Sequence, residues 1–494
     1  MYKRILCILA LVLAMALVVA CGRDNNDSDV TQDQDETRDE TPAEIQDDTQ
    51  DDGPEETDDT PTQVIDMGGR DIVFVASFAM HGVATDDPEP DPGVGTRSYF
   101  YERMMWDHLQ YMRDAYNVTF SRLVVPWDEM LSVITTSVLA GAPAGDFFML
   151  EGINNFAAIN GDLIYAINDI ASPDADIFNA RTRVMPMAEF DDKIWTVHRR
   201  EPNFGPTFMG VNLDIINYIG ADNPVELYER GEWTFDRFLE IARLATRDTT
   251  GDGINDMFGI AGPPSDIILH FIAANAGYLV MPDDFSYGLG HPNTIAALET
   301  AETIFSEGLW EYHGEGTFGD WFTNFWSFTG GRSAFFTAAT WALWTEGANL
   351  PFDYTAVPFP QGPNNPRGYQ FLEAFPHGVG VARGTEDPEM VYHLFELMNA
   401  WHGDNLAYAY GQPTEYARAA FRTEACVQRM LEFIPRRRMD LGLSVVADDG
   451  WQLGWMASTF AYSFHTGGAT IAQIIEENRL HAQSVIDDTF AAFR

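Results

Sequence analysis

The most specific pattern of oxygen-bearing residues lies between residues 248 and 256, where the chain reads DTTGDGIND. Side-chain oxygens at positions 1, 3, 5 and 9, a carbonyl at position 7 and a glycine at position 6 match an EF-hand-type calcium loop. Gly259 stands at position 12, where a bidentate glutamate normally completes the shell. We therefore expect a weak or water-completed structural Ca²⁺ site, and a turn rich in Asx hydrogen bonds without an ion is the alternative. The predicted ligands are Asp248, Thr250, Asp252, Ile254 and Asp256.

No other spacing in the sequence indicates catalytic or cofactor chemistry. The chain has no Ser-His-Asp order, HExxH, Walker loop or strand-linked GxGxxG. Its three cysteines, Cys7, Cys21 and Cys426, lie too far apart for a zinc site or a disulfide framework. We expect no organic cofactor, and we expect Cys426 to be a small buried apolar residue.

The first residues have the pattern of an export signal. Lys3 and Arg4 precede an apolar run over residues 5–20, which is short for a spanning helix. Val18-Val-Ala-Cys21 resembles the lipobox of bacterial lipoproteins, so residues 1–20 are a predicted signal peptide and Cys21 the predicted lipid-bearing residue. An uncleaved signal anchor is the alternative. The predicted location is the extracellular face of the cell membrane, held by lipid.

An acidic segment follows the signal. Residues 22–61 contain seventeen acids and two bases with almost no apolar side chain, so we predict a disordered tether over residues 21–69. The whole chain carries a net charge of −46, and Lys193 is the only lysine beyond the leader. Nucleic-acid binding needs clustered basic residues, so this composition excludes that class of partner.

Beyond residue 70 the apolar pattern alternates between the periods of strands and helices, which indicates an α/β architecture. Thr234 is a plausible N-cap for a helix over residues 235–247. No internal repeat is visible, which argues against solenoids. The predicted strands cover residues 71–77, 118–125 and 146–151, and the predicted helices between them cover residues 99–116 and 127–139.

Five segments, in order, resemble the extracellular solute-binding proteins of ABC importers, in the group that includes maltose-binding proteins. The segment AGAPAGDFFMLE is similar to the "G…PD" entry into a ligand-facing strand, and TFMGVN to the "YN" crossing between lobes. GGRSAFF resembles "GkaAM", PFPQGP resembles "vvPlPkGP", and the last helix is similar to the final helix of the family. These segments cover residues 140–151, 207–216, 330–336, 352–363 and 471–490.

This resemblance implies a periplasmic-binding-protein-like class II fold, with two α/β lobes, a hinge and a ligand cleft between them. Ligands of open α/β sheets bind at the carboxyl ends of the strands, and hinge closure then buries the solute. The implied division assigns residues 70–206 to lobe 1, 207–357 to lobe 2, 358–425 to a return into lobe 1, and 426–494 to C-terminal helices mainly of lobe 2.

The resemblance also implies a ligand site rich in aromatic rings. Sugar rings pack their C–H faces on such rings, while their hydroxyls bind amides and carboxylates, so we expect a carbohydrate ligand. Any single tryptophan here is about as often core as cleft. The predicted ligand-binding residues are Trp341, Trp344 and Trp455 as stacking surfaces and Glu151 and Asn154 as hydrogen-bonding groups.

The expected function is therefore that of a monomeric, non-enzymatic solute-binding protein that delivers a sugar or oligosaccharide to an ABC transporter permease. An extracellular glycoside hydrolase or lyase fits the acidic, aromatic composition as well, because acids are abundant enough to supply a catalytic pair. The same fold binding a peptide or another small solute is a third alternative.

Overall fold

The computed structural model divides the chain into two units, Met1–Gln63 and Val64–Arg494. Every residue that it describes belongs to the second unit. The predicted signal peptide, Cys21 and nearly all of the predicted tether therefore lie outside the described residues. The described residues are 65–78, 83–91, 99–179, 184–199, 207–312, 327–339, 350–372, 377–403, 418, 420–433, 437–438, 440–445, 447 and 451–491.

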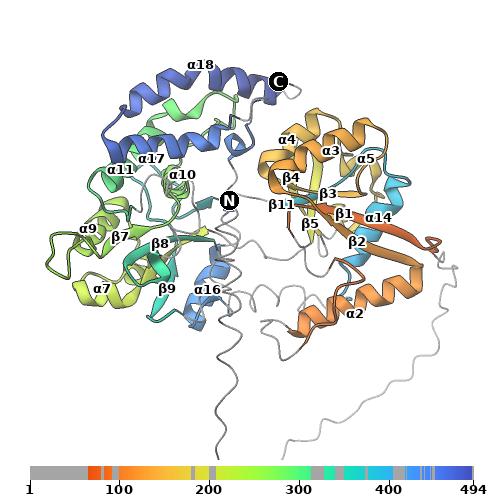
Figure 1. Ribbon diagram of the computed structural model, residues 1–494, viewed down its shortest axis with the longest axis horizontal. Coiled ribbons are helices and arrows are strands. Elements are labelled where there is room, and N and C mark those ends of the chain that lie inside the picture. Colours follow the sequence, from red (N-terminus) through yellow and green to blue (C-terminus); the bar gives the residue numbers. More distant parts are fainter. Residues whose placement is uncertain are drawn as a thin grey trace, which may run out of the picture. The chain divides into compact units, whose positions relative to one another are not determined.

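A six-stranded mixed sheet organises the first part of the described chain, in the order β2-β1-β3-β11-β5-β4 (Figure 1). β1 pairs in parallel with both β2 and β3, while β11 runs antiparallel to β3 and separates it from β5. We call this sheet and its helices lobe 1. The strands are β1 (Arg70–Ala76), β2 (Val118–Val124), β3 (Phe147–Glu151), β4 (Val184–Phe190), β5 (Lys193–Arg199) and β11 (His377–Val381).

The helices of lobe 1 follow the predicted alternation. The helical spacing of Met105, Leu109 and Met112 buries one face of the helix after β1, and Met130 and Ile134 do the same after β2. These strands and helices confirm the predicted α/β pattern within one residue at each end, except that the first three residues of the predicted helix over residues 127–139 form a 3₁₀ turn. The helices are α2 (Tyr99–Tyr116), α3 (Met130–Leu139), α4 (Gly152–Asn160), α5 (Ile167–Ile170), α6 (Asp176–Asn179) and α14 (Pro388–Met398), and a 3₁₀ turn, η1, covers Trp127–Glu129.

A four-stranded sheet, in the order β7-β8-β6-β9, organises the second part, which we call lobe 2. β7 and β8 are parallel, and β6 is antiparallel to both of its neighbours. At the end of β6 the Asn212 side chain accepts the N–H of Ile215, so the asparagine of the predicted crossing segment caps the next helix. The strands are β6 (Thr207–Asn212), β7 (Phe258–Ala261), β8 (Ser333–Ala339) and β9 (Tyr354–Val357).

Helices pack on the second sheet and on one another, and several of their starts follow the sequence signals. Thr234 accepts the N–H of Arg237 and caps α9 as predicted, while Thr470 and Gln473 form a reciprocal capping box at the last helix. No helix of the described residues is long and apolar enough to cross a membrane. The helices are α7 (Leu213–Ile219), α8 (Pro224–Glu229), α9 (Phe235–Ala245), α10 (Pro264–Ala274), α11 (Pro292–Ser306), α16 (Glu424–Phe433), α17 (Met456–Thr466) and α18 (Ile471–Thr489).

The chain rejoins lobe 1 at β11. Just beyond residue 358, where the sequence analysis placed the return, the backbone still contacts lobe 2: Gln361 donates its N–H to the carbonyl of Trp233, at 2.9 Å. Two residues of the short strand β10 (Phe371–Leu372) then pair with β12 (Arg437–Arg438). Cys426, on α16, is 1% exposed, which confirms that it is a buried apolar residue.

Helix α4 contacts the C-terminal elements of lobe 2 at both of its ends. Ser444, in the 3₁₀ turn η6 (Leu441–Ser444), donates to the Gly152 carbonyl, and Asn160 donates to the Thr489 carbonyl at 2.7 Å. Between these bonds the ring centroids of Phe156 and Phe490 lie 4.8 Å apart. Residues of both sheets therefore share one continuous hydrophobic cluster.

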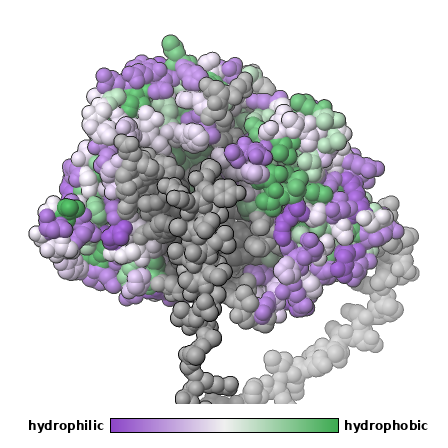
Figure 2. Space-filling model, viewed as in Figure 1, coloured by the Kyte–Doolittle hydropathy of each residue, from purple (hydrophilic) through white to green (hydrophobic). Residues whose placement is uncertain are grey.

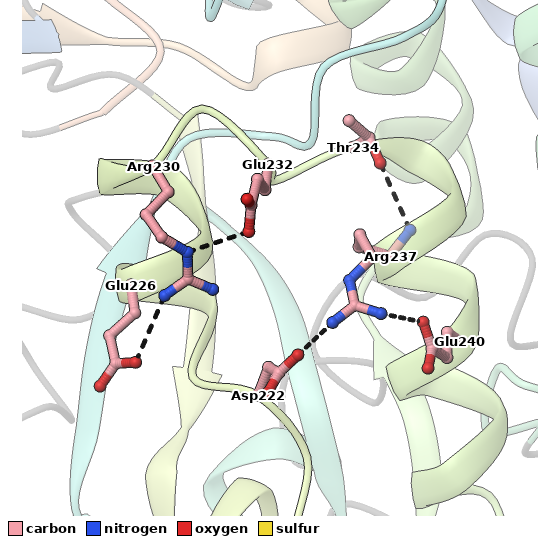
Figure 3. Close-up of polar contacts among 7 residues, drawn as sticks. All are labelled: Asp222, Glu226, Arg230, Glu232, Thr234, Arg237 and Glu240. Carbon is pink, nitrogen blue, oxygen red and sulfur yellow. Dashed lines mark hydrogen bonds and ion pairs between the residues drawn. The ribbon is translucent and has the colours of Figure 1, made fainter.

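The surface of lobe 2 pairs its arginines with the abundant acids. Figure 3 shows Arg230 and Arg237, each held between two carboxylates at the ends of α8 and α9. Such exposed pairs stabilise a fold only slightly, and they offset part of the repulsion within an acidic protein. The carboxylates are Glu226 and Glu232 for the first arginine, and Asp222 and Glu240 for the second.

Candidate ligand-binding site

The carboxyl ends of three parallel strands bring polar side chains together at one edge of the first sheet. Ser77 directly follows β1, Trp127 begins η1 shortly after β2, and Glu151 is the last residue of β3. Because β1 pairs in parallel with both neighbours, these three ends lie at the same edge. His377 reaches the same edge from the antiparallel strand β11, where its Cα is paired with that of Glu151.

The carboxylate of Glu151 joins these residues into one network. Its Oε2 accepts the indole N–H of Trp127 at 2.6 Å, and its Oε1 accepts the Ser77 hydroxyl at 3.2 Å. The His377 Nε2 lies 3.1 Å from the same Oε1. Glu151 is 8% exposed and His377 is equally buried, so these bonds form largely away from water. Together they fix the carboxylate from three separate segments of the chain.

The same surroundings set the charge of Glu151. Burial on its own would raise the pKa of this carboxyl group. The hydrogen bonds from His377, Trp127 and Ser77 and the electrostatic interaction with His377 outweigh burial, so the pKa lies below its ordinary value of 4.5. The carboxylate is therefore ionised at neutral pH, and it acts as an acceptor of hydrogen bonds rather than as a donor of a proton.

Apolar side chains reach the surface around this network. Phe78, which follows Ser77, is 39% exposed, and its ring lies edge-on to His377 with centroids 5.5 Å apart. Trp127 is 44% exposed, and the end of β2 exposes Val124. Figure 2 shows hydrophobic residues gathered right of centre, in the half of the view that Figure 1 gives to lobe 1. This edge combines apolar surface with one fixed negative charge.

The structure describes three of the five predicted ligand-binding residues. Glu151 lies in the network, and Asn154 is buried in the first turn of α4 directly after it. Trp455 ends the 3₁₀ turn η7 (Leu453–Trp455) at the start of α17 in lobe 2, and it is 59% exposed. Trp341 and Trp344 lie outside the described residues, beyond the end of β8.

Trp127, Ser77 and His377 were not among the residues predicted to bind a ligand. For Trp127 and Ser77 a usable signal existed, because both follow predicted parallel strands and such ends meet at one edge. For His377 no local signal exists, since its strand comes more than two hundred residues after Glu151 and runs in the opposite direction.

The predicted calcium loop forms a compact turn closed by its own hydrogen bonds. Asp248 accepts the N–H of Gly251 at 2.6 Å and of Gly253 at 2.7 Å, and Gly253 has the left-handed φ of 88° that its position requires. Asp256 accepts both the N–H and the hydroxyl of Thr249 at 2.9 Å. The bonds from the Gly253 and Gly251 N–H groups lower the pKa of Asp248. The left-handed backbone at Gly253 is the conformation that the glycine at this position of the loop indicates.

The donor set of this loop fits a calcium ion only in part. Among the described residues, no group of three or more His, Cys, Asp or Glu side chains is gathered as metal ligands. Gly259, at the position of the missing glutamate, lies in β7 where an added Cβ would come within 2.8 Å of the Ala242 carbonyl of α9. Packing of β7 on α9 therefore explains the glycine, and the calcium site stays a prediction.

Several solved structures have a fold similar to that of this chain. No known family model and no curated protein matches the sequence. The sugar-binding protein MalE from Xanthomonas citri is similar over 86% of this chain and 99% of its own, with 11% identity and a TM-score of 0.59. The maltodextrin-binding domain MalE from Bdellovibrio bacteriovorus, bound to maltotriose, covers 85% and 100%, with 11% identity and a TM-score of 0.57.

A third similar structure has a different ligand. UgpB from Mycobacterium tuberculosis, in complex with glycerophosphocholine, covers 84% of this chain and 98% of its own, with 16% identity and a TM-score of 0.56. At these identities the similarity concerns the fold. The described part of the chain therefore has the two-sheet α/β, class II fold of the solute-binding proteins of ABC importers, the group that includes the maltose-binding proteins.

Proposed function

We propose that this protein is a solute-binding protein that captures a sugar or oligosaccharide between its two lobes and presents it to an ABC transporter permease. The observation that carries this proposal is the edge of the first sheet, where a fixed carboxylate lies beside exposed aromatic and aliphatic side chains. Such a surface suits a ligand that presents apolar ring faces, as sugars do. The fold supports capture by hinge closure rather than chemistry on the ligand.

The state of Glu151 argues against a role for this residue as the general acid of a hydrolase. A glycosidase needs a general acid whose pKa is raised, so that a proton is available near neutral pH. The pKa of Glu151 is instead lowered, and its oxygens accept hydrogen bonds from three side chains. A carboxylate held in this way binds or positions other groups and does not donate a proton.

The proposal includes a membrane anchor and a calcium loop. The lipobox-like end of the leader supports acylation of Cys21, and the acidic segment after it supports a tether that holds the folded body away from the membrane surface. The turn over residues 248–256 supports a weak Ca²⁺ site of structural rather than ligand-binding character. The permease would recognise the closed, solute-loaded state.

Thermal unfolding of the purified protein with defined solutes tests the function. Maltotriose, cellotriose, a tripeptide and glycerophosphocholine are the probes, since a ligand of the native state stabilises it by about 2.7 kcal/mol at a hundredfold excess over Kd. We expect an oligosaccharide to raise the midpoint and no reducing ends to be released on incubation. A shift with the peptide alone would overturn the carbohydrate class, and release of reducing ends would overturn the binding function.

A further inference from the structure

The indole of Trp127 is fixed by its polar edge while much of the ring stays exposed. Its N–H, the only hydrogen-bond donor of the ring, points inward to Glu151 at 2.6 Å. The residue is nevertheless 44% exposed. An exposed tryptophan without such a bond turns among rotamers and loses entropy when a ligand holds it still. Trp127 is therefore ordered before any ligand arrives.

The carboxylate that holds the indole is itself held on its other oxygen. Ser77 and His377 both lie within hydrogen-bond distance of Oε1, which leaves Oε2 directed at Trp127. Glu151 occupies the N-cap position of α4, but its side chain makes no capping bond to that helix. The side chain is thus committed to the indole, the hydroxyl and the imidazole rather than to its own backbone.

We propose that Trp127 is the ring surface on which lobe 1 stacks the solute, and that Glu151 is a positioning residue that acts through Trp127. This inference rests on the proposed function, and it replaces the direct hydrogen-bonding role that the sequence analysis gave to Glu151. The solute that it fits is an uncharged sugar unit that lays a C–H face on the indole. An anionic sugar is disfavoured, because the Glu151 charge lies beside the ring and Asp128 and Glu129 follow Trp127 directly.

A double-mutant cycle separates positioning from direct binding. Calorimetric titration with maltotriose and cellotriose is carried out on the wild type, Trp127→Ala, Glu151→Gln and the double variant. Trp106→Ala is the matched control, because the Trp106 indole also donates one bond, to the Asp87 carbonyl at 2.9 Å, but on α2. Glutamine keeps the size of Glu151 and one acceptor oxygen, so it weakens the network without opening a cavity.

The expected losses differ between the two roles. We expect Trp127→Ala to weaken sugar binding roughly 30-fold and Glu151→Gln roughly 5-fold, with Trp106→Ala within about 2-fold of the wild type. In the Trp127→Ala background the Glu151→Gln change should cost less than about 2-fold, because its target is gone. An undiminished loss there would mean that Glu151 binds the sugar directly, and an unchanged affinity in Trp127→Ala would overturn the stacking role.

A ligand-independent measurement tests the positioning step by itself. In protein labelled with ¹⁵N at the tryptophan indoles, the Trp127 signal is assigned by its disappearance in Trp127→Phe. We expect slow exchange of this N–H with solvent and a clear shift of the signal in Glu151→Gln, while the Trp106 signal stays in place. A fast-exchanging Trp127 signal that ignores Glu151→Gln would overturn the positioning role.

The calorimetric titrations and the indole signal together also separate this inference from the proposed function. If neither sugar binds the wild type, the carbohydrate proposal and the stacking role are both overturned, and the indole signal alone decides the link between Glu151 and Trp127. If the sugars bind and only the variants behave unexpectedly, the proposed function stands and the assignment of Trp127 is wrong.

Discussion

Glu151 and Asp248 each organise a network of hydrogen bonds, and the two networks differ in where their donors come from. The donors to Glu151 lie 24, 74 and 226 residues away along the chain, and the carboxylate is buried. The donors to Asp248 lie two to five residues away, and their bonds to its carboxylate are exposed to solvent. The network of Glu151 forms only when the fold brings distant segments together, whereas the network of Asp248 is specified by the neighbouring residues of its own loop.

This difference has energetic consequences. When an exposed carboxylate loses a hydrogen bond within the protein, water takes the place of the lost partner. The stability of a local turn therefore depends little on any one of its hydrogen bonds. A buried acceptor has no such replacement, and its donors lose their partner when it is removed.

Removal of the Glu151 carboxylate should have the largest effect on stability. We expect Glu151→Ala to lower the free energy of unfolding by about 3–5 kcal/mol, because the indole N–H, the hydroxyl and the imidazole lose their shared acceptor. Urea unfolding followed by circular dichroism measures this loss. Glu151→Gln is the control and should lose less, and an alanine variant as stable as the wild type would contradict the idea that the network supports lobe 1.

His270 tests the effect of burial in lobe 2, because it is fully buried and its Nδ1 lies 2.7 Å from the Asp266 carbonyl, while the backbone of Leu372 also interacts with its ring. Burial lowers its pKa from 6.5 to about 4. The unfolded chain therefore binds a proton that the folded one does not between these values, and stability should fall by about 2 kcal/mol as the pH drops from 7.5 to 5.

Unfolding measured from pH 7.5 to pH 5 tests this contribution of His270. Glu151 titrates below its ordinary value of 4.5 and so contributes little to this window. The pH dependence should be clearly shallower in His270→Gln, which keeps a donor for the Asp266 carbonyl but does not titrate. Identical slopes in the two proteins would show that His270 takes up its proton without unfolding.

The addition of Ca²⁺ tests whether the turn over residues 248–256 binds an ion. With the glutamate position occupied by Gly259, a Kd near 1 mM is the expected order of affinity, so 10 mM Ca²⁺ should stabilise the protein by about 1.4 kcal/mol. The effect should shrink in Asp252→Asn, where the amide oxygen still accepts the Ile254 N–H. Equal stabilisation of both proteins, or stabilisation by Mg²⁺ alone, would leave the loop as a turn without an ion.

The ion pairs of Figure 3 should have the smallest effect. Arg237→Ala is expected to cost about 0.5 kcal/mol or less, and less still in high salt, because both of its partners are exposed. Thr234→Ala, which removes the cap of the same helix, should cost about 1 kcal/mol. Denaturant titration at two ionic strengths compares them, and an arginine variant that loses more than the cap variant would reverse this ranking.

The sequence predicted those features that depend on neighbouring residues. The period of the apolar side chains located β1, α2, β2 and β3, and Thr234 marked the start of α9, because helix faces and caps are set within a few positions. Glu151 was singled out only through the family resemblance, while its partners were missed. The pairing of His377 with Glu151 depends on the antiparallel register of β11, which no local pattern contains.

The place of β11 in the first sheet also affects how the protein can be made. This strand lies between β3 and β5, yet it is encoded about 180 residues after β5. Until the ribosome has added residues 377–381, β3 and β5 keep open edges and the hairpin of β4 and β5 cannot join the parallel strands. Late closure of long-range pairs slows folding and exposes strand edges. The first sheet therefore cannot close until most of the chain has been synthesised.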